Sequence, residues 1–184
     1  MKKSWPGRRP LHAGRVVDLG LEPVTLPDGT RLELEVVRHP GGAAVVALDA
    51  HDRVCLLRQW RHAAGGWLWE LPAGRLEPGE PPLETARREL EEEAGLQAGH
   101  WDPLGRILTT PGFCDELIHL FLARELRPVP QRLEHHECLE VHWIPVREAE
   151  AWVRTGRIRD AKTLAGLCLA RAWSPVVPAG EDTP

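Results

Sequence analysis

Three glutamates near the C-terminal end of a predicted helix are the residues best placed to do chemistry. In the stretch ARRELEEEAGL, Glu92 and Glu93 follow Glu89 by three and four residues, so a helix brings all three carboxylates to one face. Like charges at that spacing repel by about 0.2–0.5 kcal/mol per pair, and the helix dipole disfavours negative charge at this end. A bound divalent cation would supply the missing positive charge, and such an ion usually also contacts substrate phosphates. The alternative is an ordinary solvated charged face.

The helix that carries these glutamates is predicted to run from about residue 81 to 94. Pro81 and Pro82 suit its first positions, and Gly95 suits the residue that caps its C-terminus. Its apolar side chains recur at intervals of three and four residues and form the stripe that faces the core: Leu83, Ala86, Leu90 and Ala94. The three glutamates lie about a quarter to a third of a turn from that stripe, at the edge of the core where solvent screening is reduced.

The other predicted elements are strands on both sides of this helix and two helices at the end of the chain. A hairpin covers residues 15–39 with Asp28-Gly29 in its turn, and residues 43–50 and 53–61 form a second pair of strands. The later strands are 67–74, 105–110, 117–125 and 138–145, and the final helices are 147–156 and 160–173. This order of elements indicates an α+β fold or a mixed-sheet sandwich.

Length and composition limit the class of protein. The 184 residues fit one main domain, 41–173, preceded by the hairpin segment 1–40 and followed by a tail, 174–184, that we expect to be disordered. The net charge of −4 argues against nucleic-acid binding, and no apolar run approaches the roughly 20 residues of a membrane span. The four cysteines are far apart in sequence and read as reduced thiols, and the N-terminus does not resemble a signal peptide. We therefore expect a cytoplasmic protein with neither nucleic acid nor membrane as a partner.

A wider pattern surrounds the three glutamates. From Gly74 the sequence reads Gly, five residues, Glu80, seven residues, and then Arg-Glu-Leu-x-Glu-Glu-x-Gly-Leu from Arg88 to Leu96. This resembles the Nudix box, and its nine defined positions are all filled, which makes the signal specific. The resemblance implies the Nudix fold, an α/β/α sandwich around a mixed sheet in which the box forms a loop–helix–loop. It also implies divalent-metal-dependent hydrolysis of a nucleoside diphosphate linked to another group.

The resemblance also implies roles for residues of the box. The implied metal is Mg²⁺, for which Mn²⁺ or another divalent cation can substitute. The implied ligands are Glu89, Glu92, Glu93 and the backbone carbonyl of Ala73. Glu80 and Arg88 are implied as supporting residues whose salt bridge holds the helix against the loop, together with Gly74, the first residue of the box.

The residues around the box resemble one branch of the family, the ADP-ribose pyrophosphatases. The similarity rests on RQWRHAAGGWLWELPAGRLEPGE ahead of the box helix and on Pro111, in TTPGFCDELIHLFLA, fifteen residues beyond the box. It implies that Arg61 contacts the substrate and that Glu116 holds the terminal ribose, with Gly112 and Arg38 as further substrate-binding candidates. The alternatives are that Arg61 is an exposed charge, that Glu116 is a strand-edge residue and that Pro111 begins a plain turn.

Splitting a pyrophosphate also needs a carboxylate that orients or deprotonates the attacking water. In the resembling enzymes it often comes from a loop after the box, and here the loop LEHHECLEV offers Glu137 and Glu134. Glu137 matches the position best, and a box glutamate such as Glu92 is the third candidate. The alternative is a solvated acidic loop, and the histidine pair in it is interpreted as exposed rather than metal-binding.

Eight tryptophans against two phenylalanines and no tyrosine are an unusual balance. Trp67 and Trp69 alternate around one residue and so point to the same sheet face, and Trp60 ends the preceding strand. Stacking of adenine on such a platform would contribute about 1–3 kcal/mol. Packing in the core or at a subunit interface is the alternative.

The activity that the resemblance implies is Mg²⁺-dependent hydrolysis of ADP-ribose to AMP and ribose 5-phosphate. GDP-mannose or another nucleotide-sugar is the alternative substrate, and a non-catalytic nucleotide-sensing module with a Nudix fold is the alternative of another class. RNA decapping is disfavoured by the acidic balance of the chain. Because two strands alone are marginally stable, the N-terminal hairpin must pack on something, and in this branch it commonly packs against a second subunit. We therefore expect a homodimer.

Overall fold

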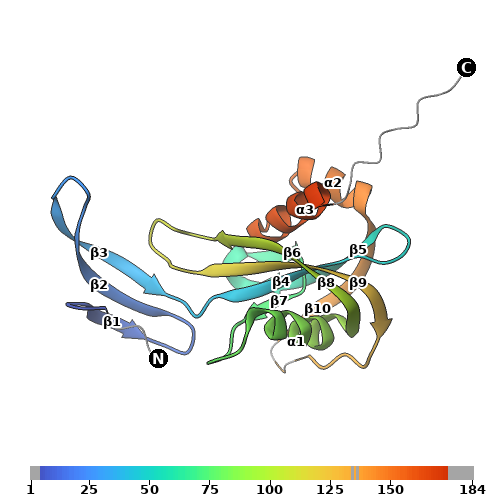
Figure 1. The fold of residues 1–184 in the computed structure, drawn as a ribbon, viewed down its shortest axis with the longest axis horizontal. Helices are drawn as coiled ribbons and strands as arrows, with labels where there is room; N and C mark the ends of the chain where they lie inside the picture. Colours follow the sequence, from blue (N-terminus) through green and yellow to red (C-terminus); the bar gives the residue numbers. More distant parts are fainter. Residues whose placement is uncertain (1–4, 134, 136, 174–184) are drawn as a thin grey trace, which may run out of the picture.

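The N-terminal segment forms a small antiparallel sheet that stands beside the main body (Figure 1). The computed structural model describes residues 5–133, 135 and 137–173, so the predicted disordered tail lies outside the described residues. The strands of this sheet, in their spatial order, are β1 (Arg9–Ala13), β2 (Asp18–Thr25) and β3 (Arg31–Arg38). β2 and β3 confirm the predicted hairpin. β1 was not predicted, because all five of its residues are exposed and its sequence has no alternation of buried and exposed positions.

Two further sheets form the middle layer of the main body. Their strands are β4 (Gly42–Ala47), β5 (Arg53–Arg61), β6 (Gly66–Glu70), β7 (Ala73–Arg75), β8 (Leu96–Leu108), β9 (Leu117–Pro128) and β10 (Leu139–Pro145). One sheet has the order β7-β4-β9-β8 and the other β10-β5-β6. β4 and β9 run parallel, and the other neighbouring strands of these two sheets are antiparallel. The larger sheet is therefore mixed, as predicted.

The prediction that β4 and β5 form a pair is wrong. The chain does turn between them at Asp52, which has a left-handed φ of 54°, but only an isolated bridge between Leu48 and Val54 joins the two segments. β4 pairs with β7 and β9, whereas β5 pairs with β6 and β10. Both strands are mostly apolar runs buried on both faces, and such runs do not reveal which neighbour a strand has.

Helices cover both faces of the middle layer, which makes the predicted α/β/α sandwich. The helices are α1 (Pro82–Ala94), α2 (Val146–Arg154), α3 (Ala161–Trp173) and the short 3-10 helix η1 (His62–Ala64). In the described part of the chain, none of them is long and apolar enough to cross a membrane. Ala44 and Val46 of β4 pack in the apolar cluster with α2 and α3, while Ala43 and Val45 pack in the cluster with α1. α1 thus lies on the opposite face from α2 and α3 (Figure 1).

Candidate active site

The helix α1 holds the three glutamates at the boundary between the core and a cleft. The helix follows Pro81 and ends at Gly95, whose φ of 64° is the left-handed conformation of a glycine C-cap. Glu89 and Glu93 are buried, with 7% and 3% of their surface exposed, and Glu92 is partly buried. Two of the three carboxylates therefore stand where water solvates them poorly.

Strand β7 packs its backbone directly against these carboxylates. The Ala73 N–H donates a hydrogen bond to Glu93 Oε2 at 2.7 Å. A Cβ added to Gly74 would lie 1.9 Å from Glu89 Oε1, so this position leaves room for the carboxylate only as glycine. Ala73 and the first residue of the box, Gly74, are thus in contact with two of the glutamates of the box.

A salt bridge between Glu80 and Arg88 fastens α1 to the loop before it. Arg88 Nε donates to Glu80 Oε1 at 3.0 Å, and Arg88 Nη2 donates to the carbonyl oxygen of Arg75 at 3.1 Å. Glu80 Oε2 also accepts from Thr85 Oγ1 at 2.7 Å. These hydrogen bonds, above all the one from Arg88, lower the pKa of Glu80 to about 2. Glu80 is therefore ionised at neutral pH and holds the arginine in place.

The same arginine reaches two of the three glutamates. Arg88 Nη1 lies 2.6 Å from Glu89 Oε1 and 3.2 Å from Glu92 Oε2. The neighbouring Arg87 pairs instead with Glu84, at 2.8 Å. One guanidinium group is thus shared between two carboxylates of the box and Glu80.

The electrostatics of the buried pair show a shortage of positive charge. Burial raises the pKa of Glu89 to about 7 and that of Glu93 to about 8. The negative charge of Glu137 contributes to both shifts, while Arg88 opposes the shift of Glu89 and the Ala73 N–H opposes that of Glu93. A hard divalent cation would supply the missing charge, and carboxylate oxygens are its preferred ligands.

The three carboxylates therefore fit a divalent metal, and their present hydrogen bonds show which contacts a metal would have to replace. Within the described residues, no three carboxylate, imidazole or thiol groups already gather as a metal-binding group. Glu89 and Glu92 face Arg88, and Glu93 accepts the Ala73 N–H. A metal would have to take these oxygens from their present partners.

The glutamates line a cleft of about 1040 Å³. The predicted site residues that line it are Arg61, Ala73, Gly74, Glu80, Arg88, Glu89, Glu92, Glu93, Glu116 and Glu137. Arg38 and Gly112 are not among the lining residues in the described part of the chain. Glu134 lies outside the described residues. The fold thus brings the box together with Arg61, Glu116 and Glu137, which are distant from it in sequence.

A second charged group borders the cleft, and of its members only Arg61 was predicted from the sequence. Arg61 Nη2 and Lys162 Nζ both donate to Glu70 Oε2, at 2.9 and 2.7 Å. Lys162 Nζ also lies 3.0 Å from Asp160 Oδ1. Burial opposes the ionisation of Glu70, but the hydrogen bonds and charges of Arg61 and Lys162 outweigh it and lower its pKa. The sequence did contain a signal, because Lys162 stands in the first turn of a predicted helix, where the dipole disfavours a cation.

Glu116, immediately before β9, lines another part of the cleft. Thr109 Oγ1 donates to Glu116 Oε2 at 2.6 Å. His39 Nδ1 lies 3.4 Å from Glu116 Oε1 and accepts a hydrogen bond from the Gly41 N–H at 3.1 Å. Thr109 therefore fixes one oxygen of Glu116, and the side chain lines the cleft.

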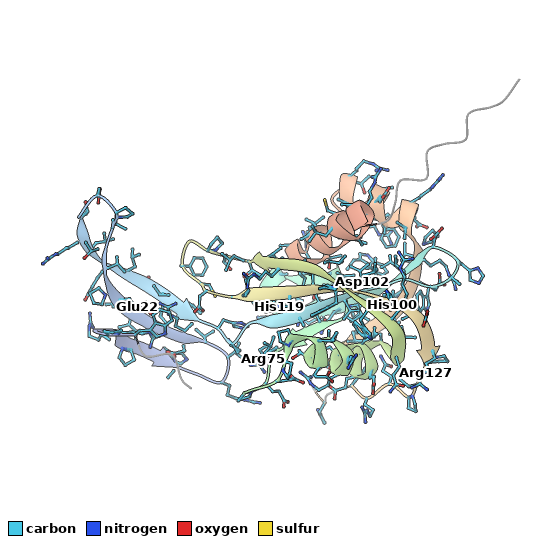
Figure 2. The ribbon with its side chains drawn as sticks, in the orientation of Figure 1. Glu22, Arg75, His100, Asp102, His119 and Arg127 are labelled. Carbon is cyan, nitrogen blue, oxygen red and sulfur yellow. The ribbon has the colours of Figure 1, made fainter. Side chains whose placement is uncertain are left out.

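Arg38 joins the N-terminal sheet to the main body. Its Nε donates to Glu22 Oε1 at 2.8 Å and its Nη1 to Asp115 Oδ2 at 3.0 Å, and its guanidinium lies 3.3 Å from the centre of the Trp5 ring. Figure 2 shows Glu22 within the N-terminal sheet. The Val37 N–H also donates to the carbonyl oxygen of Phe113 at 2.7 Å. In this single chain Arg38 is therefore a structural anchor.

The tryptophans of β5 and β6 lie away from the cleft. Trp60 and Trp67 are partly exposed and meet edge to face, with ring centres 5.9 Å apart. Trp69 packs against Trp152 of α2, with ring centres 4.8 Å apart. Among the described residues no tryptophan lines the cleft, so within one chain these rings do not border the space beside the box glutamates.

The fold and the site agree with the comparison to known families. The NUDIX domain model matches residues 38–167, and the chain belongs to the Nudix family. It is a Nudix hydrolase, a class of enzyme that hydrolyses nucleotide pyrophosphate bonds and generally uses divalent cations. The alternative of a non-catalytic module is therefore set aside.

Individual members of the family are similar to this chain over most of its length. The chain is 42% identical to an ADP-ribose pyrophosphatase of Mycobacterium tuberculosis over 88% of its length and 80% of that protein. It is 38% identical to an ADP-ribose pyrophosphatase of Bacillus subtilis, covering 89% of each chain. It is also 37% identical to a GDP-mannose pyrophosphatase of Cronobacter sakazakii, over 74% of this chain and 80% of the other. A crystal structure described as an ADP compounds hydrolase aligns with a TM-score of 0.76 at 22% identity, covering 94% and 96% of the two chains, and it shows the shared fold.

Proposed function

We propose that this Nudix hydrolase cleaves the pyrophosphate of ADP-ribose to AMP and ribose 5-phosphate with Mg²⁺ as its metal. The observation that carries the proposal is one cleft that joins the carboxylates of α1 to Arg61 and Glu116. The carboxylates suit a metal–pyrophosphate complex, and the arginine and the glutamate suit a phosphate and a ribose hydroxyl. The similarity to two ADP-ribose pyrophosphatases over most of the chain supports the same substrate.

The residues of the box would hold the metal ion. Glu89, Glu92 and Glu93 provide the carboxylates, and the backbone carbonyl of Ala73 is the fourth proposed ligand. A divalent ion, when bound, lowers the pKa of a water molecule and neutralises phosphate oxygens. Glu80 and Arg88 keep the helix and the loop in register around these ligands.

Glu137 is the proposed base. It lines the cleft, and its charge acts on Glu89 and Glu93, so it stands beside the metal ligands. Its carboxylate accepts a proton from the attacking water, the new P–O bond forms, and the P–O bond to the leaving phosphate group breaks. Glu134 is the other candidate from the same loop, and Glu92 is a weaker one because its carboxylate already faces Arg88.

A product assay against a small set of compounds tests this function. Purified protein with Mg²⁺ is given ADP-ribose, GDP-mannose, diadenosine polyphosphates or NADH, and released nucleotides are measured. We expect AMP to form fastest from ADP-ribose. The similarity to GDP-mannose pyrophosphatases makes that sugar nucleotide the second candidate, and faster release of GMP would establish it instead.

We also propose a homodimer that buries part of the N-terminal sheet. No helix of the described chain lies on this sheet, and several of its large apolar side chains, or those beside its strands, are exposed: Leu11, Val16, Val17, Leu26 and Leu34. Burying such side chains against a second copy would stabilise the sheet. Analytical ultracentrifugation should show a species of twice the 20.6 kDa chain mass, and a species of the chain mass alone would contradict the proposal.

A further inference from the structure

A single buried carboxylate holds two cations at the edge of the cleft. Glu70, at the end of β6, is 2% exposed, and both oxygens lie within 3.3 Å of Arg61 Nε, while Oε2 also accepts from Lys162 Nζ. Arg61 and Lys162 line the cleft, and the side chain of Lys162 is only 14% exposed. Glu70 is therefore placed to fix the direction of two cationic side chains that come from β5 and α3.

The donors of these cations are only partly used. An ammonium group has three N–H bonds, and Lys162 directs one to Glu70 and has Asp160 as its other carboxylate neighbour. Arg61 bonds Glu70 through Nε and Nη2, and none of the hydrogen bonds found among the described residues uses its Nη1. At least one N–H of each side chain is thus left for a ligand in the cleft.

The attachment of α3 to the end of β6 also has contacts that do not involve Lys162. Asp160 accepts from the Thr163 N–H at 3.0 Å and from Thr163 Oγ1 at 2.6 Å, which caps the start of the helix. The Leu71 N–H donates to Thr163 Oγ1 at 2.9 Å, which ties the helix to the end of β6. A lysine in this first turn opposes the helix dipole, so its position has no benefit for the helix itself.

We propose that Lys162 is a substrate-binding residue that donates a hydrogen bond to a non-bridging oxygen of the pyrophosphate, and that Glu70 is a positioning residue that aims Lys162 and Arg61 at it. The proposal rests on the proposed function for the presence of a pyrophosphate in the cleft. The carboxylates of α1 and Glu137 repel phosphate oxygens that a metal does not neutralise, and Lys162 and Arg61 supply the complementary charge.

Binding of inorganic pyrophosphate with Mg²⁺, measured by calorimetry, tests the proposal without reference to the nucleoside or the sugar. We expect Lys162→Met to weaken this binding about 10–100-fold, because a charge-assisted hydrogen bond is lost, and Lys162→Arg to recover part of it. Arg171→Met is the matched control, since Arg171 lies on the same helix, is exposed and pairs with Glu150 outside the cleft. It should bind pyrophosphate as the wild type does.

Glu70→Gln tests the positioning role. It should raise KM for ADP-ribose more than it lowers kcat, and its effect should be smaller when Lys162 is already methionine, because the two residues act through one contact. A merely structural role for Lys162 would instead lower the melting temperature and leave pyrophosphate affinity unchanged. If Glu70→Gln does not fold, the Lys162 variants decide the question alone.

The outcomes separate this inference from the proposed function. Wild-type protein that does not hydrolyse ADP-ribose, with pyrophosphate binding that still depends on Lys162, would reject the substrate and keep the inference. Rapid hydrolysis of ADP-ribose with pyrophosphate binding and KM unchanged in Lys162→Met would keep the substrate and overturn the inference. Wild-type protein that binds no pyrophosphate in the presence of Mg²⁺ would also overturn it.

Discussion

Two carboxylates that are buried to the same extent have pKa values shifted in opposite directions. Glu93 on α1 is 3% exposed, and burial raises its pKa to about 8. Glu70 at the end of β6 is 2% exposed, yet its pKa is lowered, because Arg61 and Lys162 outweigh the effect of burial. Burial alone therefore does not decide the charge of a carboxylate. Glu70 already has two cationic partners, Arg61 and Lys162. The raised pKa of Glu93 is what we expect of a metal ligand whose metal ion is absent.

The largest effect should come from removing the carboxylate that lacks a cation. Glu93→Gln should lower kcat by about 1000-fold, since the metal contributes several kcal/mol to catalysis. The fold should survive, because a neutral amide replaces a buried group whose charge is disfavoured. Steady-state kinetics and a thermal melt measure both effects. Glu91→Gln, on the same helix but outside the cleft, is the control, and an unchanged rate in Glu93→Gln would remove it from the metal ligands.

A smaller loss is expected from the carboxylate that acts on the water. Glu137→Gln should lower kcat by about 100-fold with little change in KM, which is the lower range for a general base. Its removal should also lower the pKa of Glu93, because the charge of Glu137 contributes to that shift. Glu140→Gln, an exposed acid of β10 outside the cleft, is the control. A wild-type rate in Glu137→Gln would move the role to Glu134 or Glu92.

The paired carboxylate of the box should matter less again. Glu80→Gln should lower activity by about 10-fold. Arg88 would lose its ion pair with Glu80 and would bind Glu89 and Glu92 more strongly, in competition with the metal. The loss should shrink as the concentration of Mg²⁺ is raised. Glu84→Gln, which breaks the exposed pair with Arg87, is the control and should leave the activity unchanged. A loss that does not depend on the metal concentration would contradict this explanation.

The smallest effect is on stability. A carboxylate with a raised pKa loses its contribution to stability as the pH rises, whereas one with a lowered pKa loses it as the pH falls. The pKa values of Glu89 and Glu93 are raised from 4.5 to about 7 and about 8, so their contribution to stability is complete below about pH 4.5 and is lost as the pH rises through 7 and 8. The melting temperature in EDTA should therefore fall between pH 5 and 9. Saturating Mg²⁺ should reverse the fall. Glu93→Gln should flatten it, and a wild-type curve in that variant would contradict the assignment.

The same contrast explains what could be predicted from the sequence. The start and end of α1 and its glutamates were predictable, because caps, apolar spacing and like-charge repulsion act within a few residues. The bridge between Glu70 and Lys162 joins residues 92 positions apart, and no local pattern reports such a contact. β1 was missed for a third reason, since a strand exposed along its whole length has no buried face to set a period.

Arg88 has a consequence for how the enzyme meets its metal. Its guanidinium occupies oxygens of Glu89 and Glu92 while the other nitrogens stay bonded to Glu80 and the backbone. The protein thus carries a tethered counter-ion of its own, which allows the acidic helix to fold before any metal arrives. An incoming ion would compete with Arg88 for these oxygens, so we expect it to bind reversibly and to exchange with ions in solution. The rate of the enzyme should accordingly follow the free divalent-ion concentration around it.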